Sequence, residues 1–118
     1  MTNQALVVGA SGIVGSALSR LLADGGWNVA GLARRPNTEA GVTPISADLL
    51  DPKALASALA GVSPTHVFLT TWARQASEAE NIRVNAQMVR NVLEAVRPTG
   101  TVRHVALVTG LKHYLGPF

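Results

Sequence analysis

The sequence of 118 residues contains no cysteine, and only 14% of its residues are charged and 4% aromatic. Without thiols the chain can form no disulfide, use no thiol nucleophile and ligate no metal through sulfur. This composition suits a reducing compartment, so we expect a cytoplasmic protein. The low charge, together with 47% hydrophobic residues, excludes a disordered chain or a solvated linker. We therefore expect one globular domain, residues 1–118.

Basic runs are also absent. The net charge of +3 comes from ten basic residues scattered along the chain against seven acidic ones, so we expect no nucleic-acid partner. The apolar stretch 5–23 is interrupted by glycines and by Arg20, which argues against a membrane span. Residues 1–4 carry no basic segment or cleavage-site pattern, so we expect no secretory signal. No residues have the spacing of metal ligands, and we expect no metal.

A glycine-rich stretch, Gly9-Ala10-Ser11-Gly12-Ile13-Val14-Gly15, separates an apolar run from a helical pattern. The run Ala5–Val8 predicts a buried parallel strand. Apolar positions after the glycines recur at helical spacing, and they are Val14, Ala17, Leu18, Leu21 and Leu22. A GxxGxxG stretch between a strand and a helix predicts a dinucleotide site. The alternative is a glycine-rich turn that serves only strand-to-helix packing.

Each glycine has a physical role in the predicted site. Gly9 allows a tight turn, Gly12 lets the backbone approach a pyrophosphate, and Gly15 lets helix and strand pack closely. The anion then meets the N-terminus of a helix, where unpaired N–H groups and the helix dipole favour it. The Ser11 hydroxyl can donate a further hydrogen bond.

Strand and helix patterns alternate along the chain. The expected strands are Ala5–Val8, Trp27–Ala33, Val42–Ala47, Thr65–Thr70 and Val102–Thr109. One helix follows the first glycines, a second begins at Asp51-Pro52, and a third begins near Ser77. The third carries an apolar stripe formed by Ile82, Ala86, Val89, Leu93 and Val96. This alternation predicts an α/β fold, a doubly wound parallel sheet with strand order 3-2-1-4-5, whose ligands bind at the carboxyl ends of the strands.

The end of the second strand indicates which dinucleotide binds. An NAD site usually has an acidic residue there, which accepts from the ribose hydroxyls, but this chain has Arg34 and Arg35. Guanidinium groups suit a 2′-phosphate, so we predict NADP(H). The alternative is a pair of solvated loop charges. Asp48, at the end of the third strand, can accept from the adenine amino group or simply turn the chain.

Three further segments complete a resemblance to a known family. They are Thr71-Trp72-Ala73, the helix from Glu80-Asn81 to Asn91–Val96, and Thr109–Phe118 with the sequence TGLKHYLGPF. With these segments the chain resembles the progesterone 5β-reductase and iridoid synthase-like enone reductases, an atypical branch of the short-chain dehydrogenase/reductase superfamily with a Rossmann fold. The resemblance implies transfer of hydride from NADPH to the β-carbon of an α,β-unsaturated carbonyl compound, which leaves an enolate.

The resemblance also assigns roles to matching positions. It implies Lys112 as the catalytic lysine, whose ammonium stabilises the developing enolate charge, and Phe118 as a residue that faces the substrate. The implied cofactor contacts are Ser11, Gly12 and Ile13 at the pyrophosphate, Arg34 and Arg35 at the 2′-phosphate, Asp48 and Leu49 at the adenine, and Thr71 and Trp72 beyond the fourth strand.

The chain departs from the family at two points. Val108 stands where the family often has glutamine, which leaves only backbone contact with the cofactor. The family's catalytic tyrosine lies downstream of the segment that resembles it here, and the sole tyrosine, Tyr114, follows Lys112 by two residues. We interpret Tyr114 as structural and His113 as a loop histidine. We expect no chemical role for His66 and His104, which begin strands at the opposite end of the sheet.

The resemblance covers less than half of the family's usual chain. We therefore expect a fold truncated after the fifth strand without a substrate lobe, able to bind NADP(H) but not to turn over. The uncovered fifth strand would leave an edge through which copies can pair into a homo-oligomer. The alternative function is a non-catalytic NADP(H)-sensing module. Lys112 favours the reductase, and the missing phenol favours the sensor.

Overall fold

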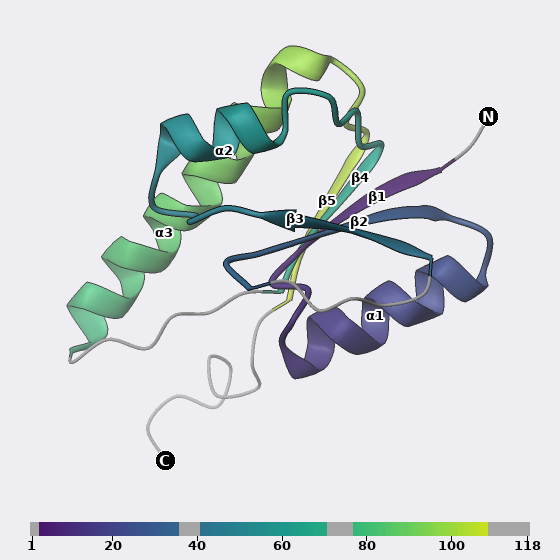
Figure 1. Ribbon diagram of the computed structural model, residues 1–118. Helices are drawn as coiled ribbons and strands as arrows, with labels where there is room; N and C mark the ends of the chain where they lie inside the picture. The colour runs from purple at the N-terminus through teal and green to yellow at the C-terminus, as the bar shows by residue number, and fades with distance from the viewer. Residues whose placement is uncertain (1–2, 36–40, 71–76, 109–118) are drawn as a thin grey trace.

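The computed structural model describes residues 3–35, 41–70 and 77–108 (Figure 1). Within these ranges the strands are β1 (Gln4–Val8), β2 (Asn28–Ala33), β3 (Val42–Ser46), β4 (His66–Leu69) and β5 (His104–Leu107). The helices are α1 (Ile13–Asp24), α2 (Pro52–Ala58) and α3 (Glu78–Val96), and a 3-10 turn (Arg97–Thr99) follows α3. Every strand lies within two residues of its expected bounds.

The strands form one parallel sheet in the order β3-β2-β1-β4-β5. In the register of its central pairs, Val8 lies opposite Leu32 of β2 on one side and Leu69 of β4 on the other. The predicted strand order is therefore confirmed. The chain adds β2 and β3 on one side of β1 and then β4 and β5 on the other. The switch point between β1 and β4 is where a doubly wound fold binds its ligand.

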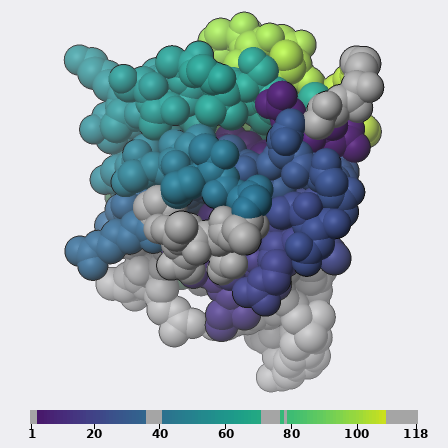
Figure 2. Space-filling view, turned by 45° about the vertical axis from the view of Figure 1, so that its right-hand side comes forward, coloured from purple at the N-terminus to yellow at the C-terminus, as the bar shows by residue number. Residues whose placement is uncertain are grey.

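The helices lie in two layers, one on each face of the sheet (Figure 1). Because side chains alternate along β1, Ala5 and Val7 pack toward α1, whereas Leu6 and Val8 face α2 and α3. Residues 5–8 of β1 are buried on both faces, as expected for a central strand of a parallel sheet. In the space-filling view, α2 in teal lies directly beside β3 in blue (Figure 2).

Side chains cap α2 and α3 as the sequence predicts. The Asp51 carboxylate accepts a hydrogen bond from the Ala54 N–H at 3.1 Å, and Pro52 occupies the first helical position of α2. The Ser77 hydroxyl accepts from the Glu80 N–H at 3.2 Å and caps α3. Glu80 also pairs with Arg83 at 2.7 Å, and the hydrogen bond from this guanidinium lowers the pKa of the Glu80 carboxyl.

The apolar stripe expected along α1 is only partly correct. Leu18 and Leu22 pack against the core, but Leu21 is 68% exposed. The most buried residues of α1 are instead Gly15 and Ser19, and the Ser19 hydroxyl donates to the Gly15 carbonyl at 2.7 Å. The reason is that α1 approaches the sheet at backbone distance, so small residues occupy the contact.

The stripe expected along α3 faces mostly the wrong way. Ile82 is 61% exposed, and Ala86 is exposed as well. The side chains that α3 buries against the sheet recur every four residues, and they are Val84, Met88, Val92 and Val96. The helix thus carries two apolar faces, and the expected stripe followed the outer one except at Val96, which is buried as expected. That outer face lines a groove of about 530 Å³ together with Leu107 of β5.

The fifth strand is uncovered among the described residues, as expected. All of β5 is solvent-exposed, including Val105 and Leu107, although β5 pairs in parallel register with β4. β5 therefore forms an open edge of the sheet.

Candidate dinucleotide-binding site

The turn between β1 and α1 lies at the carboxyl edge of the sheet. Gly9 has φ of 88°, in the left-handed region that favours glycine. Its N–H donates to the Leu32 carbonyl at 2.8 Å, and the Ala10 N–H donates to the same carbonyl at 3.2 Å. These two bonds continue the pairing of β1 with β2 into the turn. The turn is therefore fixed to the strand that carries Arg34 and Arg35 at its end.

Gly15 is required by packing within the protein. A Cβ at this position would lie 2.1 Å from the Gly9 carbonyl oxygen and 2.8 Å from the Thr70 hydroxyl oxygen. No side chain fits at those distances, because backbone atoms block the space. The close approach of helix and turn that the sequence predicts is present.

Gly12 needs another explanation. Its φ of −76° and ψ of 174° are open to any residue, and a Cβ there would meet the Gly9 oxygen at 3.4 Å, an ordinary contact distance. Neither backbone strain nor internal packing within the described residues requires glycine at this position. A bare backbone here suits a ligand that approaches from outside, as a pyrophosphate does.

The first turn of α1 supplies the donors for such a ligand. Gly12 is the N-cap residue and has no side chain with which to cap the helix. The first N–H groups of an α-helix have no intrahelical acceptors, and the helix dipole makes this end positive. Ser11 and Ile13 are exposed beside them, Ile13 to 93%. This arrangement fits an anion and leaves an apolar side chain next to it.

Thr70 is a site residue that the sequence analysis did not single out. Its hydroxyl donates to the Val8 carbonyl at 2.7 Å and approaches the Gly9 carbonyl at 3.3 Å. Thr70 directly follows β4, so it joins the glycine turn to the far side of the switch point. The sequence could have indicated this role, because Thr70 is a hydroxyl residue at the end of the strand next to the switch point.

Arg34 and Arg35 follow β2 and are exposed. The Arg34 carbonyl accepts a hydrogen bond from the Ser46 hydroxyl at 2.8 Å. Ser46, at the end of β3, therefore fixes the backbone that carries the first guanidinium. This is a second contact that the sequence did not reveal, because it joins two adjacent strand ends.

Asp48 and Leu49 lie in the turn after β3. The Asp48 Oδ1 atom accepts from the Leu50 N–H at 2.9 Å, so one carboxylate oxygen turns the chain. The other oxygen, Oδ2, makes none of the hydrogen bonds found among the described residues. Leu49 is buried, and its carbonyl accepts from the Asn91 side chain at 2.8 Å. Asp48 can therefore turn the chain through Oδ1 and still accept a hydrogen bond from an adenine amino group through Oδ2.

Several predicted residues lie outside the described ranges, namely Thr71, Trp72, Lys112, His113, Tyr114 and Phe118. His66 and His104 begin β4 and β5 at the amino edge, opposite the glycine turn, and their rings stack at 5.0 Å. Within residues 3–35, 41–70 and 77–108, no three acidic or histidine side chains gather as a metal site would require. None of the helices described is long and apolar enough to cross a membrane.

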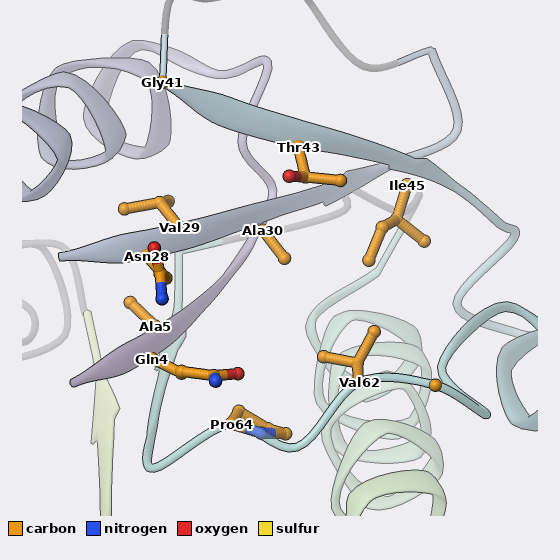
Figure 3. Close-up of a pocket in the computed structure, with 11 residues that line it drawn as sticks. Gln4, Ala5, Asn28, Val29, Ala30, Gly41, Thr43, Ile45, Val62 and Pro64 are labelled. Carbon is orange, nitrogen blue, oxygen red and sulfur yellow. The ribbon is translucent and has the colours of Figure 1, made fainter. Parts of the chain in front are cut away.

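A hollow of about 310 Å³ lies at the amino ends of β1 and β2, away from the glycine turn (Figure 3). Its polar side chains are Gln4, Asn28 and Thr43, and its apolar wall includes Ile45 and Val62. Among the described residues that line it, no side chain is charged. This hollow therefore lacks the cations and helix N-terminus that a phosphorylated cofactor requires, and the carboxyl edge is the candidate site.

Comparisons with known proteins identify the family to which the chain belongs. A model of the NAD dependent epimerase/dehydratase family matches residues 5–113. The chain is 43% identical to the 3-oxo-Delta(4,5)-steroid 5-beta-reductase of Arabidopsis thaliana, a match that covers 97% of this chain and 32% of that protein. It is 41% identical to an (S)-8-oxocitronellyl enol synthase of Nepeta cataria, with the same shares covered. The expected resemblance is confirmed, and the chain spans about a third of the length of these relatives.

A solved structure supports the fold. A short-chain dehydrogenase/reductase superfamily protein from Agrobacterium tumefaciens, crystallised with bound NAD, is 28% identical and superposes with a TM-score of 0.71. The match covers 89% of this chain and 32% of that one.

Proposed function

Since the chain belongs to the NAD dependent epimerase/dehydratase family, we propose that it is the NADP(H)-binding portion of an enone reductase. The observation that carries this proposal is the similarity, over 97% of the chain, to a steroid 5β-reductase and to (S)-8-oxocitronellyl enol synthases. The substrate class would be α,β-unsaturated carbonyl compounds, and the reaction a reduction of their carbon–carbon double bond.

The glycine turn supports the dinucleotide half of this proposal. The donors at the start of α1 and the bare backbone of Gly12 suit a pyrophosphate, with Ser11 and Ile13 beside it. Asp48 and Leu49 would bind the adenine side, and Thr71 and Trp72 the part of the cofactor beyond β4.

Arg34 and Arg35 support NADP(H) rather than NAD(H). Both follow the strand whose end receives the adenosine ribose in this fold. A guanidinium donates planar paired hydrogen bonds to a phosphate, whereas a carboxylate at the same place would repel it. The 2′-phosphate is therefore the group that these side chains would recognise.

Bound NADPH supplies the hydride for such a reduction. The chain's own contribution to the chemistry would come from Lys112, assigned by resemblance. An ammonium held near the carbonyl oxygen stabilises the negative charge that develops there as the enolate forms. Phe118 would face the substrate and help to orient it.

Calorimetric titration with NADPH and NADH tests the cofactor assignment. We expect tighter binding of NADPH, and a loss of at least about tenfold in that preference, or about 1.4 kcal/mol, in the variant Arg34→Ala. A matched control is Arg103→Ala, because Arg103 immediately precedes β5 at the amino edge of the sheet. An unchanged preference in Arg34→Ala would contradict the phosphate clamp.

Deuterium transfer tests the reaction. In an assay of the full-length protein that contains this portion, with steroid, monoterpene dial and small enones and with NADPH deuterated at the reactive carbon, the label should appear at the β-carbon of the product. Label at the carbonyl carbon would contradict the proposal. Lys112→Met should abolish turnover while NADPH still binds. NADPH binding by the full-length protein without turnover of any enone would favour the NADP(H)-sensing module instead.

A further inference from the structure

One buried side chain of α3 reaches across to the turn after β3. Asn91 is only 6% exposed, and its Nδ2 group donates to the Leu49 carbonyl oxygen at 2.8 Å. The two residues are 42 positions apart in the sequence. This bond connects the helical layer to the turn that carries Asp48.

The chemistry of the neighbours fixes the orientation of the Asn91 amide. The Leu49 carbonyl can only accept, so the NH₂ group of Asn91 must face it. On the other side the Gln87 Nε2 group, which can only donate, lies 2.7 Å from the Asn91 Oδ1 atom. Both ends of the amide are therefore satisfied, and a reversed Asn91 amide would place its oxygen against the Leu49 carbonyl oxygen.

The turn is rigid within itself but lies at the edge of the sheet. The Leu50 N–H donates to Asp48 Oδ1 at 2.9 Å, and the Asp51 N–H donates to the Asp48 carbonyl at 3.0 Å. These bonds set the shape of the turn, whereas β3, the strand that leads into it, is an edge strand. The side chains of Ala47 and Leu49 are buried in the core shared with α3, and Asn91 adds a directional hydrogen bond that fixes the Leu49 backbone next to Asp48.

We propose that Asn91 is a positioning residue for adenine recognition, which holds Asp48 so that its Oδ2 atom meets the adenine amino group. The inference deepens the proposed function and rests on it, because it requires that a dinucleotide binds at this edge. Hydrogen-bonding constellations tolerate displacements of only about 0.5 Å. Without the hydrogen bond from Asn91 to the Leu49 carbonyl, the turn could move by more than about 0.5 Å.

The test compares NADPH with its hypoxanthine analogue, in which a carbonyl oxygen replaces the adenine amino group. The native chain should bind NADPH about tenfold more tightly, as one charge-assisted hydrogen bond allows. Asn91→Leu keeps the volume but removes the donor, and it should bring the ratio of the two dissociation constants close to one. The preference for NADPH over NADH should remain, because the arginines are untouched.

Two further variants complete the design. Asn91→Ala removes the same donor with a smaller side chain that favours the helix, so it should also bring the ratio close to one. Thr101→Val is the matched control, because it removes another side-chain bond to a remote carbonyl, that of Pro64 at 2.8 Å, at the opposite edge of the sheet. The control should leave the ratio unchanged.

Each outcome decides between the two proposals. If the native chain binds neither NADPH nor NADH, the proposed function fails. If it binds NADPH but does not discriminate against the analogue, or if folded Asn91→Leu keeps the native ratio, the positioning role alone is overturned. Should Asn91→Leu fail to fold by circular dichroism, the ratio measured for Asn91→Ala decides, and a native value overturns the role.

Discussion

Gly15 and Gly12 lie three residues apart, yet different constraints act on them. In Gly15→Ala the new methyl group would overlap the Gly9 carbonyl, so the turn or the helix must shift. We expect the free energy of unfolding to fall by about 2 kcal/mol or more, and dinucleotide binding to be lost with it. In Gly12→Ala the free energy of unfolding should fall by no more than about 1 kcal/mol, the cost of alanine at an N-cap, while NADPH binding is lost.

Urea denaturation and calorimetric titration measure these two effects separately. Gly61→Ala is the control, because no atom lies within 4 Å of a Cβ built there. Native NADPH affinity in Gly12→Ala would show that no ligand approaches the backbone at that glycine.

Thr70 contributes through one hydroxyl group. Thr70→Val keeps the shape but removes the donor to the Val8 and Gly9 carbonyls. We expect the glycine turn to loosen and the dissociation constant for NADPH to rise about fivefold, as the loss of about 1 kcal/mol implies. Thr70→Ser should restore the native value. A Val variant with native affinity, or a Ser variant as weak as Val, would refute this role.

At the scale of single elements, the two faces of α3 make opposite predictions. Met88 is buried against the sheet, so Met88→Ala should lower the free energy of unfolding by about 2–5 kcal/mol. Ile82→Ala, on the exposed face, should change it by no more than about 0.5 kcal/mol. Urea denaturation of both variants tests this assignment. A larger loss of unfolding free energy in Ile82→Ala than in Met88→Ala would show that the buried and exposed faces have been assigned the wrong way round.

The elements themselves could be predicted from the sequence, because strand and helix signals depend on local residues. Asp51-Pro52 begins α2 as expected, and the glycine turn lies where the motif places it. The inner face of α3 could not be predicted, since both of its sides are apolar and only tertiary packing distinguishes them. The bonds made by Thr70 and Asn91 join residues 42 to 62 positions apart, and no local pattern encodes such pairs.

At the scale of the whole molecule, the two edges of the sheet differ. β3 carries Pro44, which cannot donate a backbone hydrogen bond and so hinders the addition of a strand. β5 has no proline, and its Leu107 is 57% exposed. Self-association of this chain, if it occurs through a sheet edge, should therefore use β5.

Sedimentation velocity at increasing concentration tests this expectation. Leu107→Lys places a charge on the open edge and should shift the chain toward monomer. Thr43→Lys, on the edge that contains Pro44, is the control and should leave the sedimentation profile unchanged. Equal self-association of the native chain and Leu107→Lys would exclude β5 as the contact.

Trp27 offers an internal reporter of how this architecture assembles. Its indole follows α1 and lies edge-on to the His66 ring at 4.8 Å and near the Phe68 ring at 6.4 Å, both on β4. The surroundings of the indole, which determine its fluorescence, form only when Trp27 from the first half of the chain has packed against β4 from the second half. In the variant Trp72→Phe, which leaves Trp27 as the sole tryptophan, the emission should follow the docking of these halves in a refolding experiment and should change little when a nucleotide binds at the remote edge.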